Sequence, residues 1–187
     1  MRRLAAAAVL VAGCASAPKT PLPVVEKVDL PRFMGDWYVV ANIPASLEEG
    51  AHNSVESYRL AADGTVETTF TFRKGSLDGP LAVYTPSGRV EDESGARWGM
   101  RFFWWWPFRL EYLVVWLNED YTQTVIGRTA RDYVWIMART PEIPEADYQR
   151  LVALVGEWGY DLSKLQRVPQ RWGVPPDLSP AQREPRG

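Results

Sequence analysis

The stretch GDWY at residues 35–38 opens the first strand-like segment of the chain, after a proline-rich leader, and two later features match it. Asp120-Tyr121 forms a turn between two apolar segments, and Arg139 closes the last apolar segment. If these places meet at one end of a barrel, the guanidinium of Arg139 can lie across the indole of Trp37. Such a stack contributes roughly 0.5–2 kcal/mol, depending on desolvation. The trio predicts that the first strand, the last strand and the intervening turn meet at one barrel end.

Several segments between residues 36 and 140 alternate polar and apolar residues with a period of two, as β-strands with one buried face do. In the clearest case Val66, Phe70 and Phe72 share one face, while Glu67 and Arg73 share the other. Glycine- and aspartate-rich turns separate such segments. The fold class expected is all-β, an eight-stranded antiparallel up-and-down barrel, because closure removes exposed edges. The expected strands are Asp36–Ile43, Ser54–Ala61, Thr65–Lys74, Leu81–Val90, Arg97–Phe103, Glu111–Leu117, Thr122–Thr129 and Tyr133–Thr140.

One α-helix is expected after the last strand. From Glu145 to Gly159 the apolar residues recur at helical spacing and form one stripe. Pro144 suits a first-turn position, and Gly159 ends the pattern. Segments 111–117 and 133–138 are apolar on both faces, which a barrel strand requires only where something covers its outer face. We therefore expect the C-terminal helix to pack on the outside of the barrel there.

The remaining chain divides into one domain and its flanks. Residues 29–168 form the expected barrel domain of about 140 residues, enough to bury roughly two-thirds of the unfolded surface. Within it, the apolar residues from Asp161 to Val168 predict a short extra strand. Residues 169–187 are rich in proline, arginine and glutamate with few apolar anchors, which predicts a disordered tail.

The chain start predicts export. Arg2 and Arg3 precede an apolar stretch from Leu4 to Ala12, too short to span a bilayer but suited to a signal peptide. It ends in Val-Ala-Gly before Cys14, which resembles a bacterial lipobox. That resemblance implies a signal peptide at residues 1–13, an acylated Cys14 and a tether at residues 14–28. The alternative is cleavage at the A-x-A pattern of residues 15–17, which would release a soluble periplasmic protein.

The GDWY stretch, the Asp-Tyr turn and the strand-ending arginine together resemble the three signatures of the lipocalins. In this sequence they fall on Gly35 and Trp37, Asp120 and Tyr121, and Arg139. The resemblance runs from residue 29 to 168 and is greatest to the bacterial lipocalins, which are outer-membrane lipoproteins. It implies a closed base, an open mouth, and a fatty acid or lysophospholipid as ligand.

Composition excludes several function classes. Loss of Arg2 and Arg3 from the 21 basic residues leaves 19 against 23 acidic ones, so the mature chain carries about −4 and gives no reason to expect nucleic acid. Cys14 is the only cysteine, which excludes intramolecular disulfides and thiol catalysis. Several acyl chains on Cys14 would give stable membrane anchoring. Because alanine, not aspartate, follows Cys14, the expected address is the outer membrane, on its periplasmic face.

Candidate ligand-lining residues follow from strand alternation. Glu67, Arg73, Arg97 and Arg101 are expected to face water, so their apolar neighbours face inward. Aromatic residues on strands that are apolar on both faces are added to these candidates. For each candidate, the alternative to ligand contact is plain packing in the core. The candidates are Phe70, Phe72, Trp98, Met100, Phe102, Tyr112, Trp116 and Trp135.

The segment FFWWWPF at residues 102–108 is expected at the barrel mouth. One interpretation is a hydrophobic plug packed on the rim. The other is an entrance that grips an acyl chain or dips into a bilayer, since tryptophan favours that interface. Bacterial lipocalins have similar segments with fewer tryptophans. The mouth residues singled out are Trp104, Trp105, Trp106 and Phe108.

Catalytic and metal-binding patterns are weak, and no cofactor is expected. His52 is the only histidine and is expected in a loop, and no histidine–cysteine cluster has metal-ligand spacing. Glu48 and Glu49 are interpreted as solvated loop charges. The main hypothesis is a membrane-anchored lipid carrier, and one alternative is a structural lipoprotein with a filled barrel. The other alternative is a lipid-modifying enzyme, which would need titratable groups inside the cavity, and the sequence indicates none there. The sequence leaves open whether the chain forms a homodimer.

Overall fold

The computed structural model describes residues 21–103, 105 and 107–172 of the 187-residue chain. The predicted signal peptide, Cys14, Trp104, Trp106 and the segment from residue 173 onward lie outside the described residues. All structural statements below refer to the described part.

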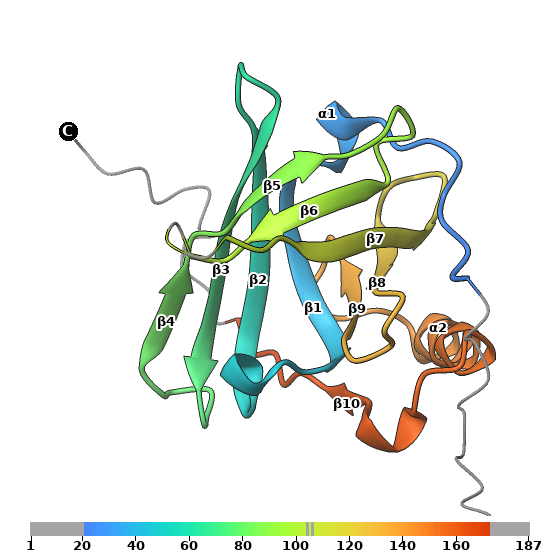
Figure 1. Cartoon of the computed structure of the whole chain (residues 1–187). Coiled ribbons are helices and arrows are strands. Elements are labelled where there is room, and N and C mark those ends of the chain that lie inside the picture. The colour runs from blue at the N-terminus through green and yellow to red at the C-terminus, as the bar shows by residue number, and fades with distance from the viewer. Residues whose placement is uncertain (1–20, 104, 106, 173–187) are drawn as a thin grey trace, which may run out of the picture.

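The fold is a closed antiparallel β-barrel, as the alternation predicts (Figure 1). From β1 to β9, neighbouring strands in the sequence pair with one another, except β4 and β5, which both pair with β3. Pairing of the first strand with the ninth closes the barrel. The barrel has eight strand positions because β4 and β5 share one of them. The strands are β1 (Gly35–Ile43), β2 (Ala51–Leu60), β3 (Thr65–Lys74), β4 (Leu81–Tyr84), β5 (Ser87–Val90), β6 (Arg97–Arg101), β7 (Leu110–Leu117), β8 (Gln123–Gly127) and β9 (Val134–Ala138).

The single strand predicted at residues 81–90 is in fact two strands, β4 and β5, which pair with different parts of β3. Thr85 and Pro86 interrupt it. Proline has no backbone N–H to donate to a sheet ladder, so the strand cannot continue through it. The carbonyl of Pro86 instead accepts a hydrogen bond from the backbone N–H of Thr68 at 3.0 Å. The predicted strand at 97–103 also ends early, at Arg101.

One end of the barrel is closed by a helical turn that the strand pattern did not predict. This turn, α1 (Leu30–Phe33), is capped by the Asp29 carboxylate, which accepts from the Arg32 N–H, and has a proline in its first turn. It places the fully buried ring of Phe33 against Trp37, with ring centroids 5.0 Å apart. In Figure 1 α1 lies at the upper end of the barrel, beside the turn between β5 and β6.

Aromatic side chains fill the half of the barrel nearest α1. Trp98 meets Phe33 edge to face at 5.5 Å and stacks on Tyr112 at 4.8 Å. Tyr58 meets Trp98 edge to face at 5.6 Å. An eight-stranded barrel is wide enough either to be filled by side chains or to hold one small ligand. Here the closed half is filled, so any ligand space lies toward the other end.

The helix α2 (Glu145–Glu157) packs on the outside of the barrel, as predicted. Its buried residues Leu151 and Val155 join a second apolar cluster with Val125 and Ile136, which lies outside the barrel interior. Gly159 follows with a φ of +82°, a left-handed conformation that glycine adopts without strain and that ends the helix. Among the described residues, no helix is long and apolar enough to cross a membrane.

The segment after α2 completes the wall between β1 and β2. Its elements are η2 (Leu162–Lys164) and a two-residue strand, β10 (Gln166–Arg167), which pairs with β1. The extra strand predicted at 161–168 is therefore correct in place but shorter. Ordered contacts continue four residues past the predicted boundary at 168, because Gln170 donates to the Val39 carbonyl at 2.8 Å and Trp172 meets Tyr38 edge to face at 5.2 Å.

Candidate functional site

Arg139 is the centre of the closed barrel end. Its Cζ lies 3.8 Å from the ring centroid of Trp37, which is the predicted guanidinium–indole stack. The guanidinium also donates to the carbonyls of Asp36 at 2.8 Å, Phe33 at 3.0 Å and Tyr121 at 3.2 Å. Burial lowers the pKa of Arg139 to about 10, so it stays charged at neutral pH. The stack therefore joins the first strand, α1 and the turn after β7.

The other signature residues have different surroundings. Gly35 has a φ of +91°, which a residue with a Cβ rarely adopts, and its added Cβ would lie 3.4 Å from the Arg139 guanidinium. The hydroxyl of Tyr121 accepts from the backbone N–H of Asp29 at 2.8 Å, and Arg32 lies 4.1 Å from its ring centroid. Asp120 is exposed. The side chain of Asn118 organises this turn instead, by accepting from the N–H groups that follow it.

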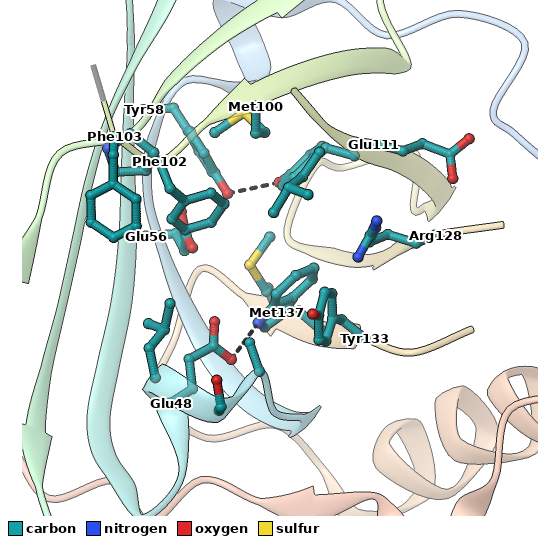
Figure 2. Close-up of a pocket in the computed structure, with 17 residues that line it drawn as sticks. Glu48, Glu56, Tyr58, Met100, Phe102, Phe103, Glu111, Arg128, Tyr133 and Met137 are labelled. Carbon is teal, nitrogen blue, oxygen red and sulfur yellow. Dashed lines mark hydrogen bonds between the residues drawn. The ribbon is translucent and has the colours of Figure 1, made fainter. Parts of the chain in front are cut away.

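The opposite half of the barrel contains a cavity of about 420 Å³, within the range of sites for small ligands (Figure 2). Most of its lining is apolar, and it is bounded by the loop after β1, the segment after β6 and the start of β9. Tyr58 and Tyr112, which belong to the aromatic filling of the closed half, also line it. The lining residues are Ala45, Ser46, Leu47, Glu48, Glu56, Tyr58, Pro86, Met100, Phe102, Phe103, Leu110, Glu111, Tyr112, Arg128, Tyr133, Trp135 and Met137.

Four of the eight candidate lining residues line this cavity: Met100, Phe102, Tyr112 and Trp135. Phe70, Phe72 and Trp98 also belong to the inner cluster, but they pack as core and do not border the cavity. Alternation therefore predicts the correct face of the sheet for these seven residues, but it carries no information on how deep in the barrel each one lies.

Trp116 is the exception, because it lies on the outer face. It packs with the apolar cluster beneath α2, and the guanidinium of Arg150 lies 4.9 Å from its ring centroid. The β7–β8 register shifts between Val114 and Trp116. One extra residue at such a bulge reverses the inward and outward faces of everything beyond it. The prediction that Trp116 faces the interior is therefore wrong.

The mouth segment is exposed where the structure describes it. Trp105 and Phe108 are 59% and 65% exposed, and neither borders the cavity. Phe103 does border it, and its ring stacks on Trp105 with centroids 5.5 Å apart. Trp104 and Trp106 lie outside the described residues. The aromatic segment thus extends from the cavity wall to the protein surface.

Two buried glutamates in the cavity lining were missed by the sequence reasoning. Glu48, interpreted above as a solvated charge, is only 2% exposed and accepts from Asn42 Nδ2 and Trp135 Nε1, both at 3.0 Å. Burial raises its pKa to about 7. Glu56 is 8% exposed, and burial together with the nearby charge of Glu48 raises its pKa to about 8. The expectation that the cavity lacks titratable groups is therefore wrong.

Strand register could have identified Glu56. It lies directly opposite Phe70 in the β2–β3 pairing, and directly opposed residues share a face of the sheet. Since alternation places Phe70 inward, Glu56 must also be inward. Glu48 offered no such signal, because it lies on the 3-10 turn η1 (Ser46–Glu48), which carries it into the barrel.

Other polar groups of the cavity lining have hydrogen-bond partners, although the buried Nε of Arg128 has none among the described residues. The hydroxyls of Tyr58 and Tyr112 are 2.7 Å apart. Arg128 donates to Asp132 at 2.9 Å and lies 4.8 Å from the ring centroid of Tyr133. Among the described residues, no group of three or more histidine, cysteine, aspartate or glutamate side chains could hold a metal ion. The cavity is therefore an apolar pocket with one acidic wall.

An up-and-down barrel with one closed end, an external helix and an apolar cavity at the other end defines a small-molecule-binding barrel protein. The family model of the lipocalin-like domain matches residues 28–170, so the chain belongs to the lipocalin family. Lipocalins are generally binding and transport proteins for small hydrophobic molecules.

Curated relatives agree with this assignment. The chain is 30% identical over 169 residues to the outer membrane lipoprotein Blc of Escherichia coli K12, covering 89% of this chain and 93% of that protein. It is 29% identical over 174 residues to temperature-induced lipocalin-1 of Arabidopsis thaliana, covering 90% and 93%.

Solved structures share the fold at lower identity. Insecticyanin from the tobacco hornworm Manduca sexta superposes with a TM-score of 0.62 at 14% identity over 87% of each chain. The cockroach allergen Per a 4 gives 0.61 at 16% identity, over 81% of this chain and 94% of that one. At these identities the likeness shows the barrel fold alone.

Proposed function

We propose that this protein binds single-chain lipids, fatty acids or lysophospholipids, in the barrel cavity and carries them at the cell envelope. The cavity of about 420 Å³ is the observation that supports this proposal most strongly. Each Å² of apolar ligand surface hidden there contributes about 25 cal/mol, so a hydrocarbon tail supplies the affinity. A completely filled barrel, the structural alternative, would have no such space.

Ligand binding is expected to be saturable, with one lipid per chain, and to require the cavity. The test is a titration with palmitate and with a lysophospholipid, followed by quenching of the indole fluorescence. Ala45→Trp places a large ring in the cavity lining and should abolish the quenching. Ala62→Trp, in the exposed turn at the other end of the barrel, is the matched control and should bind normally. An unsaturable signal, or normal binding by Ala45→Trp, would contradict the proposal.

We propose that the protein binds the lipid without changing it chemically. Its test is incubation of the purified protein with a lysophospholipid, with analysis of the lipid by mass spectrometry. The lipid is expected to be recovered unchanged. Turnover by the native chain that disappears in Glu56→Gln would favour the enzyme instead, because Glu56 is a buried titratable group in the cavity lining.

The mouth segment is expected to contribute to lipid uptake but little to stability. Trp105 is 59% exposed, so Trp105→Ala should change the free energy of unfolding by less than about 0.5 kcal/mol. We expect it to lower lipid affinity or membrane association several-fold, measured by titration and by vesicle co-sedimentation. Leu162→Ala, which removes an apolar side chain that is 41% exposed and remote from the cavity, is the control. Equal effects of the two changes would argue against a role for the mouth.

The envelope location is proposed from the lipobox-like residues before Cys14 and from the similarity to outer membrane lipoproteins. Acylated Cys14 would hold the barrel on the periplasmic face of the outer membrane through the tether of residues 14–28. Cys14→Ser is expected to move the protein from the outer-membrane fraction, measured by fractionation and immunoblotting. Unchanged fractionation, with no acyl mass on the native chain, would contradict the anchor.

A further inference from the structure

Glu48 and Glu56 place two carboxyl groups on one side of the cavity (Figure 2). Glu48 comes from η1 at the mouth, and Glu56 comes from β2, next to the tyrosine pair. The two groups are close enough for the charge of Glu48 to raise the pKa of Glu56. They therefore act as one acidic wall in a cavity whose lining is mostly apolar.

No positive side chain among the described residues pairs with this wall. Around it lie Asn42 from β1, Tyr58 from β2, Tyr112 from β7, and Tyr133 and Trp135 at the start of β9, none of them cationic. The cation of the lining, Arg128, lies on the other side of the cavity in Figure 2 and is paired with Asp132. Glu111 also lies on the Arg128 side of the cavity, and its carboxylate accepts hydrogen bonds from the backbone N–H and the hydroxyl of Thr129.

An unsatisfied acceptor lies beside the wall. The side chain of Asn42 is 2% exposed and donates to Glu48 through its amide nitrogen, but its Oδ1 has no hydrogen-bond partner among the described residues. Buried polar atoms are rarely left unpaired in proteins. The polar cluster around Glu48 therefore has one acceptor in excess of its donors. Glu56 has a hydrogen bond from Tyr58 but, like Glu48, no cation beside it among the described residues.

A buried carboxylate is costly unless an opposite charge accompanies it. In the free protein a proton supplies that charge. A ligand with a positive head can replace the proton, whereas a ligand with a negative head would meet like charge. The ring of Trp135, which already donates to Glu48, also offers a face suited to an organic cation.

We propose that Glu48 and Glu56 form a subsite for an ammonium head group, so that the cavity selects single-chain amphiphiles bearing a primary amine or quaternary ammonium over those bearing a free carboxylate. The proposal rests on the proposed function, because the tail of the same ligand occupies the apolar remainder of the cavity. Binding at neutral pH then releases protons from the wall to solvent.

The test is calorimetric titration of the full chain carrying Cys14→Ser, which has no acyl chains of its own, with dodecyltrimethylammonium, dodecylamine, dodecanol and dodecanoate. Both cations are expected to bind at least tenfold more tightly than dodecanoate. Their binding enthalpy at pH 7 should vary with the ionisation enthalpy of the buffer, because protons are released. Glu48→Gln and Glu56→Gln should each weaken the cations roughly 10- to 100-fold, because each change removes a negative charge that faces the ammonium and, for dodecylamine, also a hydrogen bond to a charged group.

The controls separate the subsite from the cavity. Dodecanol shares the tail but has no charge, so its affinity should change less than about threefold in either glutamine variant. Glu49→Gln removes the exposed neighbouring charge and should leave all affinities unchanged. If none of the four amphiphiles binds, the proposed function and the subsite both fail. If they bind with equal affinity, or if dodecanoate binds best, the ammonium subsite alone is overturned.

Discussion

Trp37→Ala is expected to lower the free energy of unfolding by roughly 3–5 kcal/mol, the range for truncation of a large aromatic side chain in a packed core. The indole is fully buried, packs on Phe33 at 5.0 Å and donates to the Phe33 carbonyl at 2.8 Å. Its removal also leaves the Arg139 guanidinium without the ring that it covers at 3.8 Å. Urea denaturation followed by circular dichroism measures the change.

Two variants separate the causes of that loss. Trp37→Phe keeps an aromatic ring beneath Arg139 but removes the indole N–H, so it should retain a large part of the stability lost in Trp37→Ala. Trp105→Ala removes a ring of the same size from an exposed position and should have almost no effect. A similar loss in Trp37→Ala and Trp105→Ala would mean that the closed end does not hold the barrel together.

The closed end could be predicted from the sequence because its residues combine unusual requirements. The sequence has a glycine two residues before a tryptophan, then a turn, and then an arginine at the end of the last strand. Few other structures require this combination. The structure brings Gly35, Trp37 and Arg139 together. The one-turn helix α1 was missed because four residues give no periodicity. Its capping signal, Asp29 before a Leu-Pro pair, was available in the sequence.

The cavity could be predicted only in part, because alternation determines the face of a strand but not depth. Phe72 and Phe102 both face inward, yet only Phe102 borders the cavity. A bulge near Trp116 turns its side chain to the outer face of the barrel, and the alternation of polar and apolar residues does not reveal a bulge in advance. Glu48 shows a further limit, since a loop residue acquires its burial from the path of the chain rather than from its neighbours in sequence.

The acidic wall is expected to make the free protein less stable as the pH rises. In the folded chain the pKa is about 7 for Glu48 and about 8 for Glu56, against 4.5 for an exposed glutamate. Between these values the folded state binds more protons than the unfolded state, so the free energy of unfolding falls with pH. The stability conferred by the protonated wall is complete below about pH 4.5 and is lost by about pH 8. Each unit by which a pKa is raised corresponds to about 1.4 kcal/mol, so the total fall amounts to several kcal/mol.

Urea denaturation at intervals between pH 5 and 9 measures this fall, and Glu56→Gln isolates its source. An uncharged amide of the same shape carries no proton to lose, so only Glu48, whose pKa burial raises, still contributes to the slope. The variant should therefore have a flatter profile and exceed the native chain in stability at pH 8 to 9. Glu49→Gln, at an exposed position, should retain the native slope.

Exposed carboxyls with lowered pKa, such as Glu145, act in the opposite sense and only below about pH 4.5, outside the measured range. A native chain that is most stable at pH 8 to 9 would contradict the buried acidic wall, and the ammonium subsite would lose the charge on which it depends.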